Sequence, residues 1–251
     1  MPQLPGAEPF AAEGGRVGAL VLHGFTGQPA SMRPWAEHLA AAGLTVRLPL
    51  LPGHGTSWQE LARTRWTDWY AEAERAFDEL RGRCDEVFVM SLSMGGALSL
   101  RLAEERADQV AGQVLVNPAI ASKDWRLKLL PVLSKVVATV PPVGNDIKKP
   151  GVSEHAYDTV PTKGARTLQQ LMAVVRADLS KITAPTLVYR SVDDHVVQPV
   201  SVETLVAGAT GAAVDVVELH DSFHVATLDH DAPLIFDGSL DFVRTRSKVG
   251  I

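Results

Sequence analysis

Short apolar runs recur along the chain, and each is bounded by glycine, proline or polar residues. The first, Val17–Leu22, is almost wholly apolar and leads into a His-Gly pair. An unbroken apolar run of this length is typical of a strand buried on both faces of a parallel sheet. The same pattern predicts further strands, which we place at Thr45–Leu48, Glu86–Met90, Gln113–Val116, Pro185–Arg190 and Val214–Leu219.

Between these runs, apolar residues return every three or four positions, which is the period of an amphipathic helix. Helices are expected at Pro29–Ala42, Trp66–Arg81, 97–106, Leu168–Asp178, Val200–Gly208 and Pro233–Thr245. Strands and helices that alternate with short connections predict an α/β fold, with one mostly parallel sheet flanked by helices. Ligands bind such sheets at the carboxyl ends of the strands.

The alternation stops after the strand that ends near Asn117 and resumes only after residue 161. The intervening segment carries an apolar stripe between Trp125 and Val140, followed by a stretch rich in proline, glycine and lysine at 141–151. We interpret residues 120–163 as a small cap that lies over the carboxyl ends of the strands. The whole chain, residues 1–251, is then a single domain with this insertion.

Composition excludes several classes of protein. Of the 251 residues, 46% are hydrophobic and 21% are charged, which is typical of a soluble globular chain. A formal net charge of −5 gives no reason to expect nucleic-acid binding. The single cysteine, Cys84, excludes an intramolecular disulfide and fits a reducing compartment. We find no signal peptide and no membrane-spanning run, and we expect a cytoplasmic protein without stable membrane insertion, with a homodimer left open.

A candidate nucleophile lies where the strand near residue 90 meets a helical pattern. The stretch reads Ser91-Leu-Ser93-Met-Gly95-Gly96. A strand that turns sharply into a helix with serine at the apex is the nucleophile elbow of serine hydrolases, and its strained backbone exposes the serine hydroxyl. Small residues must flank the apex two positions away. Gly95 satisfies this need, whereas Ser91 stands where the usual pattern has glycine, so Ser93 is the candidate within an imperfect Ser-x-Ser-x-Gly match.

A serine nucleophile needs a base to take its proton and an acid to orient that base. Candidates for both follow later predicted strands, in the order acid and then histidine that this elbow requires. We favour Asp194 over its neighbour Asp193, because the residues after Asp194 let the chain turn back into the fold. We favour His224 over His220, because His224 lies in the loop and has the longer reach. His230 is expected to be structural or at the surface.

The oxyanion of a tetrahedral intermediate needs backbone N–H donors. We predict Met94, which follows the nucleophile, and Phe25, in the loop His23-Gly-Phe-Thr-Gly27 after the first long strand. His23 is expected to brace this loop by hydrogen bonding rather than to act as a second base. No cluster has metal-ligand spacing and no phosphate-binding loop follows the first strand, so we predict no metal and no cofactor.

Five segments together resemble the bacterial carboxylesterase and monoacylglycerol lipase group of the α/β-hydrolase fold. They are His23–Gly27, Leu51–Gly55, Leu92–Gly96, Asp193–Val197 and Ser222–Leu228. The resemblance covers the chain from about Gly15 to Phe242 and implies that Asp194 is the triad acid, His224 the base and Phe25 an oxyanion donor. It also implies that Glu154, within 146–154, contacts the glycerol hydroxyls of a substrate. Val143 in the same insertion is predicted as a second substrate-binding residue.

We therefore predict a carboxylic ester hydrolase that acts on monoacylglycerols or similar medium- and long-chain acyl monoesters. The apolar stripe of the cap is expected to line a tunnel for the acyl chain. The same triad also serves carbon–carbon bond hydrolases, thioesterases and cofactor-free haloperoxidases, and some proteins of this fold are small-molecule receptors. Rapid labelling of Ser93 by a fluorophosphonate would favour catalysis over the receptor. Ser91 stands where members of the resembling group have glycine. Whether the elbow keeps its geometry and full activity with Ser91 is therefore a question for the structure and for assays.

Overall fold

A computed structural model describes residues 3–142 and 144–250 of the chain. Within them, a seven-stranded sheet has the order β1-β3-β2-β4-β5-β8-β9. Neighbouring strands run parallel except for the short edge strand β1, which pairs antiparallel with β3. The strands are β1 Phe10–Ala12, β2 Val17–Leu22, β3 Thr45–Leu48, β4 Glu86–Leu92, β5 Val110–Val116, β8 Thr186–Ser191 and β9 Val214–Leu219.

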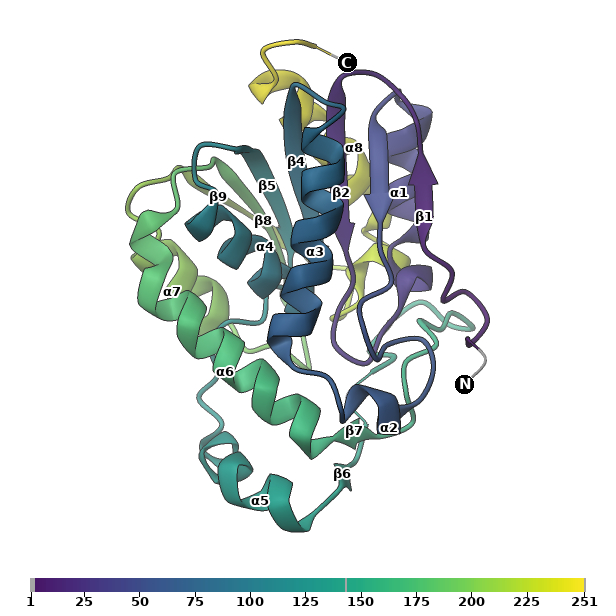
Figure 1. Cartoon of the computed structure of the whole chain (residues 1–251), viewed down its shortest axis with the longest axis vertical. Helices are drawn as coiled ribbons and strands as arrows, with labels where there is room; N and C mark the ends of the chain where they lie inside the picture. The colour runs from purple at the N-terminus through teal and green to yellow at the C-terminus, as the bar shows by residue number, and fades with distance from the viewer. Residues whose placement is uncertain (1–2, 143, 251) are drawn as a thin grey trace.

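Helices cover both faces of this sheet (Figure 1). Helices α1 and α8 pack on one face, in a buried cluster that contains Trp35 and Ile235. Helices α3 and α4 pack on the other face, around Trp69 and Phe77, and α6 lies against α4. This arrangement confirms the predicted fold class. The helices are α1 Arg33–Ala41, α2 Trp58–Leu61, α3 Trp66–Arg81, α4 Met94–Glu105, α5 Leu130–Val136, α6 Thr162–Asp178, α7 Val200–Gly208 and α8 Ala232–Arg246.

Several boundaries differ from the sequence prediction, and two of the differences involve closely packed glycines. Strand β5 begins at Val110 rather than Gln113, and Gly112 within it leaves room for two aromatic rings. A Cβ at Gly112 would lie 2.9 Å from the ring of Phe242 and 3.0 Å from that of Phe88. Helix α6 begins at Thr162 rather than Leu168, and a Cβ on its Gly164 would lie 3.0 Å from the ring of Phe25. Glycine lowers helix and strand propensity, so both extensions were hidden from the pattern.

The insertion between β5 and α6 consists of two unlike parts. Residues 125–140, called the arm below, form a 3-10 helix at Trp125–Leu129, then α5, then β6 at Thr139–Val140. Residues 144–157, called the strap below, contain no helix or strand and lead to β7 at Val160–Pro161, which pairs antiparallel with β6. Figure 1 shows the arm projecting beyond the carboxyl ends of the parallel strands.

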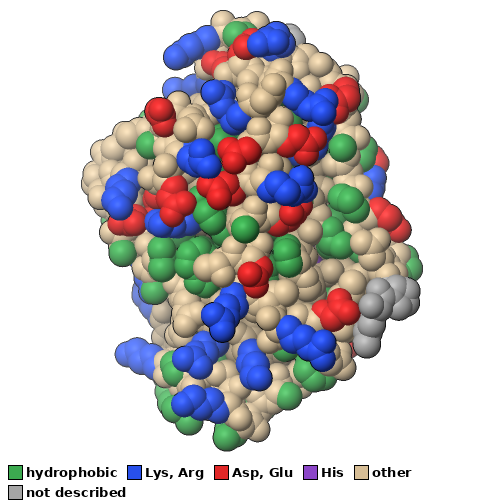
Figure 2. Space-filling model, in the orientation of Figure 1, with side chains coloured by type: hydrophobic (Ala, Val, Ile, Leu, Met, Phe, Trp, Pro, Cys, Tyr) green, Lys and Arg blue, Asp and Glu red, His purple; other side chains and the backbone are tan. Residues whose placement is uncertain are grey.

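Apolar side chains remain on the outer side of the arm. Trp125 is 66% exposed, Val132 69% and Val136 78%, whereas Leu130 is buried. Figure 2 shows several Lys and Arg side chains gathered around the same lower end of the molecule. Of the helices in the described part of the chain, none is long and apolar enough to cross a membrane.

Candidate active site

Ser93 occupies a strained turn between β4 and α4. Its backbone has φ 56° and ψ −117°, a conformation that non-glycine residues rarely adopt. Three backbone hydrogen bonds hold it there: Ser93 N donates to the Val116 carbonyl at 3.0 Å, and the Ser93 carbonyl accepts from Gly96 N at 2.9 Å and Ala119 N at 3.0 Å. The turn at Ser93 is thus fastened to the end of β5 and the residues that follow it.

The elbow also depends on two glycines after Ser93. A Cβ at Gly95 would lie 2.4 Å from the Leu22 carbonyl oxygen, and one at Gly96 would lie 2.7 Å from Pro118 Cβ. Gly95 was expected from the motif, whereas the need for Gly96 follows only from this contact. Ser91 is fully buried, and its Oγ has no hydrogen-bond partner among the described residues. A buried hydroxyl without a partner costs about 1–3 kcal/mol, so we expect the turn to tolerate Ser91 at a modest cost.

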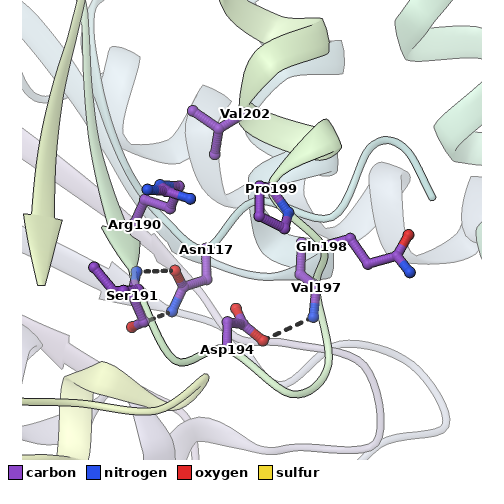
Figure 3. A pocket seen from close by; sticks show the side chains of 9 residues that line it. Asn117, Arg190, Ser191, Asp194, Val197, Gln198, Pro199 and Val202 are labelled. Atoms are coloured by element: carbon purple, nitrogen blue, oxygen red, sulfur yellow. Dashed lines mark hydrogen bonds between the residues drawn. The ribbon is translucent and has the colours of Figure 1, made fainter. Parts of the chain in front are cut away.

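Asp194 and His224 are brought together from the loops after β8 and β9. His224 Nδ1 and Asp194 Oδ2 are 2.8 Å apart, and the two side chains are 7% and 5% exposed. The other oxygen, Asp194 Oδ1, accepts hydrogen bonds from Val196 N at 2.8 Å and Val197 N at 2.7 Å. The carboxylate is therefore fixed on both sides, and Figure 3 shows its bond to Val197 N. A histidine held in this way by Nδ1 keeps Nε2 free to accept a proton.

The other candidates for acid and base lie in the solvent. Asp193 and His230 are exposed, and the side chain of His220 is 74% exposed. Of the residues proposed from sequence, the structure thus brings Asp194 and His224 together and leaves these three apart.

Nearby charges raise the pKa of His224 above its ordinary value. Burial by itself would lower this pKa, but the hydrogen bond to Asp194 and the negative charges of Asp194, Glu154 and Asp146 outweigh burial. A histidine with a raised pKa is a stronger base towards a serine hydroxyl.

Asn117 and Ser191 connect the elbow to both loops, and sequence reasoning missed both. Asn117 Nδ2 donates to Ser191 Oγ at 2.9 Å and to the His224 carbonyl at 2.8 Å, while its Oδ1 accepts from Ser191 N at 2.8 Å. Ser191 Oγ donates in turn to the Phe223 carbonyl at 2.8 Å. Asn117 lies beside a small cavity behind the Asp194 loop (Figure 3). Asn-Pro after a strand was the only signal in the sequence, and it indicates a turn rather than a network.

The loop that carries Phe25 is held by a neutral histidine. His23 Nδ1 donates to the Gly24 carbonyl at 3.0 Å, and its Nε2 accepts from Leu51 N at 3.2 Å. Burial lowers the pKa of His23 to about 4, so the ring stays neutral near pH 7. Because Gly24 O and Phe25 N belong to one peptide plane, fixing the carbonyl also fixes the direction of the N–H. His23 thus braces the loop.

The two candidate oxyanion donors, Phe25 and Met94, directly follow Gly24 and Ser93 in the chain. A Cβ at Gly24 would lie 3.3 Å from Ser93 Cβ, so the loop approaches the nucleophile closely. Among the described residues, the N–H groups of Phe25 and Met94 donate no hydrogen bond. Met94 N is at the first turn of α4, where N–H groups lack partners within the helix. Both donors are therefore available to a developing negative charge.

Glu154 of the strap is buried beside Gly27, in the loop that carries Phe25. Its Oε1 accepts from Asn145 N at 2.7 Å, and its Oε2 would be 3.2 Å from a Cβ at Gly27. Burial raises the pKa of Glu154 above its ordinary value. Val143, the other predicted substrate-binding residue, lies outside the described residues. No group of three or more His, Cys, Asp and Glu within residues 3–142 and 144–250 could hold a metal ion.

The apolar stripe predicted for an acyl tunnel is only partly enclosed. Leu130 is buried and Leu127 and Leu133 are half-buried, but Val137 is 37% exposed. The stripe faces α6, to which the arm is tied by a hydrogen bond from Gln169 Nε2 to the Leu127 carbonyl at 2.8 Å. A tunnel along the arm stays a prediction.

The sheet order, the strained serine after β4 and the Asp–His pair after β8 and β9 define the α/β-hydrolase class. A family profile described as "Serine aminopeptidase, S33" matches residues 17–231, and the chain belongs to this family. The thermostable monoacylglycerol lipase of Bacillus sp. (strain H-257) is 44% identical over 246 residues, which cover 96% of each chain.

Two further comparisons agree with this placement. The carboxylesterase of Bacillus subtilis (strain 168) is 26% identical over 237 residues, which cover 94% of this chain and 96% of the relative. A solved structure from work on LipS and LipT, two metagenome-derived lipolytic enzymes, has a TM-score of 0.94 and 41% identity. It covers 97% of this chain and 100% of that chain.

Proposed function

We propose that this protein is a serine ester hydrolase that cleaves monoacylglycerols or similar medium- and long-chain acyl monoesters. In this proposal Ser93 is the nucleophile, His224 the general base and Asp194 the acid that orients the base. The observation that carries it is the 2.8 Å contact between His224 Nδ1 and Asp194 Oδ2, both buried, on loops tied to the Ser93 turn. The identity with a monoacylglycerol lipase over nearly the whole chain supports the substrate class.

The first half of the reaction acylates the serine. His224 Nε2 takes the proton of Ser93 Oγ as Oγ attacks the ester carbonyl carbon. The N–H groups of Phe25 and Met94 donate to the oxyanion of the tetrahedral intermediate, and such donors are each worth about 10²–10³ in rate. When the intermediate collapses, the carbon–oxygen bond to the alcohol breaks and His224 gives its proton to the leaving oxygen.

The second half releases the acid. His224 takes a proton from a water molecule, whose oxygen attacks the acyl carbon and forms a second oxyanion in the same site. Collapse of this intermediate breaks the bond to Ser93 Oγ, which recovers a proton from His224. Asp194 orients His224 and stabilises the imidazolium that forms in each half.

Glu154 is proposed to bind the alcohol half of the substrate. Its carboxyl oxygens can accept hydrogen bonds from the hydroxyl groups of the substrate. Its burial beside Gly27 supports this role, because a substrate hydroxyl placed there would be shielded from water.

A rate series with matched substrates tests the substrate class. We expect kcat/KM to be higher for 1-monoacylglycerols with medium or long chains than for the corresponding triacylglycerols or for p-nitrophenyl acetate. The fold and triad alone would allow a different ester, so the comparison is decisive. A maximum at the acetate ester, with negligible monoacylglycerol hydrolysis, would contradict the proposal.

Two expectations about the setting of the protein go with this function. We propose that it acts in the cytoplasm, which cell fractionation would test, and the sequence leaves a homodimer open, which its elution volume in size-exclusion chromatography would decide.

A further inference from the structure

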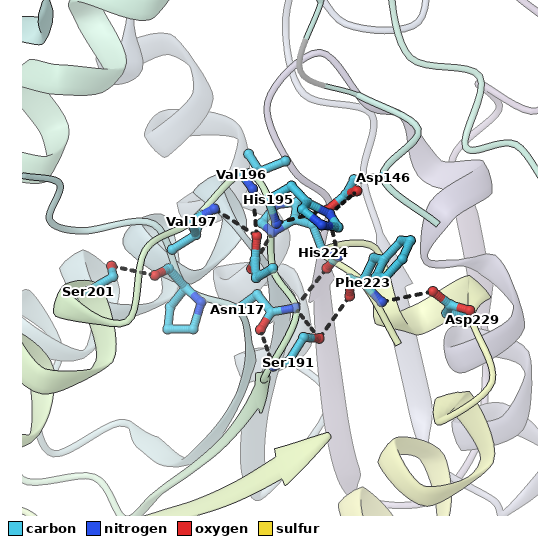
Figure 4. Close-up of polar contacts among 12 residues, drawn as sticks. Asn117, Asp146, Ser191, His195, Val196, Val197, Ser201, Phe223, His224 and Asp229 are labelled. Carbon is cyan, nitrogen blue, oxygen red and sulfur yellow. Dashed lines mark hydrogen bonds and ion pairs between the residues drawn. The ribbon is translucent and has the colours of Figure 1, made fainter. Parts of the chain in front are cut away.

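One carboxylate of the strap reaches both loops of the candidate triad. Asp146 Oδ2 accepts a hydrogen bond from His224 N at 3.1 Å and from His195 N at 3.2 Å. Its other oxygen lies 2.8 Å from His195 Nδ1, and its own carbonyl accepts from Val225 N at 3.0 Å. Its side chain is only 16% exposed. Figure 4 shows Asp146 pointing at His195 and His224.

These contacts join residues that the sheet alone does not hold together. His195 follows the acid, in the loop after β8, and His224 is the base, in the loop after β9. A single oxygen atom that accepts from the backbone of both fixes the distance between the two loops. Hydrogen bonds to a charged acceptor are stronger than those between neutral groups, so this link resists separation of the loops.

We propose that Asp146 is a positioning residue: it sets the base against the acid, and its charge stabilises the protonated base. This inference rests on the proposed roles of Ser93, Asp194 and His224. The cap then does more than cover the substrate, because a displacement of the strap would shift the catalytic histidine.

Few charged groups lie around His224 and Asp146, so the effect of the Asp146 charge can be measured. The groups that face His224 are Asp194, Glu154 and Asp146, all of which favour its charged form. Among the described residues, the side chain of Asp146 contacts His195 and the backbone of His224, and its charge also acts on Glu154. His195 is 62% exposed, and its edge meets the ring of Phe223 with the centroids 4.6 Å apart.

A second carboxylate shows that fastening the strap and setting the acid–base distance are separate tasks. Asp229 accepts from Lys148 N and Lys149 N of the strap and from Phe223 N of the base loop, at 2.7–2.9 Å. It therefore ties the strap to the base loop, but no hydrogen bond joins it to the acid loop in the described part of the chain. Of these two carboxylates, Asp146 alone reaches both loops.

Two substitutions separate the two parts of the proposal. Asp146→Ala removes the acceptor, so both loops lose their common link. We expect kcat on a soluble ester to fall about 10- to 100-fold with KM within about threefold of wild type, since small misplacements of catalytic groups have effects of this size. Asp146→Asn keeps an oxygen for the backbone N–H groups and removes the charge. We expect the acid limb of log kcat/KM against pH to move to lower pH by about half a unit to one unit.

Asp193→Asn is the matched control, because it removes the same charge from an exposed residue beside the acid. Its acid limb should stay within about 0.2 units of wild type, since exposed charges are screened by solvent. His195→Ala removes the imidazole but keeps the backbone hydrogen bonds from residues 195 and 224 to Asp146, and it should lower kcat by no more than about threefold.

Thermal unfolding of each variant identifies those that do not fold. If Asp146→Ala fails to fold, the shift of the acid limb in Asp146→Asn tests the proposal by itself.

The proposal is wrong if folded Asp146→Ala keeps the wild-type kcat, or if the Asp146 and Asp193 amides move the acid limb equally. Ser93→Ala, assayed in the same series, reports on the underlying function separately. If Ser93→Ala stays active, the proposed function fails. If it is inactive while the Asp146 variants behave as wild type, only the positioning role fails.

Discussion

The two parts of the cap have opposite character. The strap places carboxylates where they accept hydrogen bonds from the backbone: Asp146 from the triad loops and Glu154 from Asn145. The strap also binds the loop that carries Phe25, because Tyr157 N donates to the Thr26 carbonyl at 3.3 Å. The arm instead presents Trp125 and Val132 to solvent and is fastened mainly to α6.

The strap therefore holds groups of the candidate active site in place, whereas the outer side of the arm can be substituted with little effect. Buried polar groups with several partners are costly to disturb, because every lost bond leaves another group unpaired. Exposed apolar side chains have few neighbours to lose. We therefore expect substitutions in the strap and its partners to act on stability and rate, and substitutions on the outer side of the arm to act on neither.

The largest effect on stability is expected at Asp229, which joins the strap to the base loop. It is 2% exposed and accepts four backbone hydrogen bonds, from Lys148, Lys149, Phe223 and His230. Asp229→Ala would leave these N–H groups unpaired and lower the free energy of unfolding by about 3 kcal/mol. Differential scanning calorimetry would show this as a fall in Tm of roughly 6–12 °C.

Asp221 provides the control for that experiment. It lies in the same loop, 62% exposed, and pairs with Lys148 at 2.8 Å. Surface ion pairs contribute about 0–1 kcal/mol, so Asp221→Ala should shift Tm by only a few degrees at most. Equal losses in both variants would mean that the buried link between strap and base loop is no stronger than a surface contact.

A smaller effect, specific for substrate, is expected at Glu154. Glu154→Gln keeps the shape of the side chain but replaces one acceptor oxygen of the carboxyl group by an amide NH2 group, which only donates. We expect kcat/KM for a 1-monoacylglycerol to fall about tenfold, the value of one hydrogen bond, and that for a p-nitrophenyl ester of the same acid to change less than threefold. Parallel assays with both substrates measure the difference. Equal losses of kcat/KM on both substrates would show that Glu154 does not bind the alcohol half and has a structural role instead.

The pH dependence of the rate tests whether the carboxylates around His224 raise its pKa. The reaction needs neutral His224, and the pKa of this residue is raised above its ordinary value of about 6.5. Activity should therefore be present above the raised pKa and be lost as the pH falls through it. A profile of kcat/KM against pH should place the acid limb above 6.5. An acid limb well below 6.5 would show that burial outweighs the neighbouring carboxylates.

The smallest effect is expected on the outer side of the arm. Val132→Ser and Val136→Ser should each change the free energy of unfolding by no more than about 0.5 kcal/mol and leave the rate on a soluble ester within twofold. Leu130→Ala, on the buried side of the same helix, is the control and should cost about 2 kcal/mol or more. Chemical denaturation measures all three. A large loss at Val132 or Val136 would mean that this face is covered in solution.

Much of the fold could be predicted because it follows from local pattern. Buried strands such as β2 show as unbroken apolar runs, and helices such as α3 show as stripes. Edge strand β1 escaped prediction, because three residues in a segment rich in proline, glycine and alanine carry no such pattern. The arm is a related case: its apolar stripe was evident, but which side would be covered depends on the position of α6.

The site divides along the same line. Ser93, Asp194 and His224 could be proposed from sequence, since each follows a recognisable strand in the expected order. Asn117 and Asp146 could not, because their roles come from contacts with residues far along the chain. Asp146 bonds to residues 49 and 78 positions away, and an aspartate in a polar loop otherwise indicates only a solvated turn.

The identity of the nucleophile is the central claim, and Ser93→Ala tests it most directly. The variant removes one oxygen atom and keeps the fold, which circular dichroism and Tm would verify against wild type. We predict that hydrolysis of a monoacylglycerol falls by at least about 10⁴-fold, as when other triad serines are removed. We also predict that a fluorophosphonate, which labels the wild-type protein at Ser93, no longer reacts. A folded Ser93→Ala protein with activity near wild type would contradict the account.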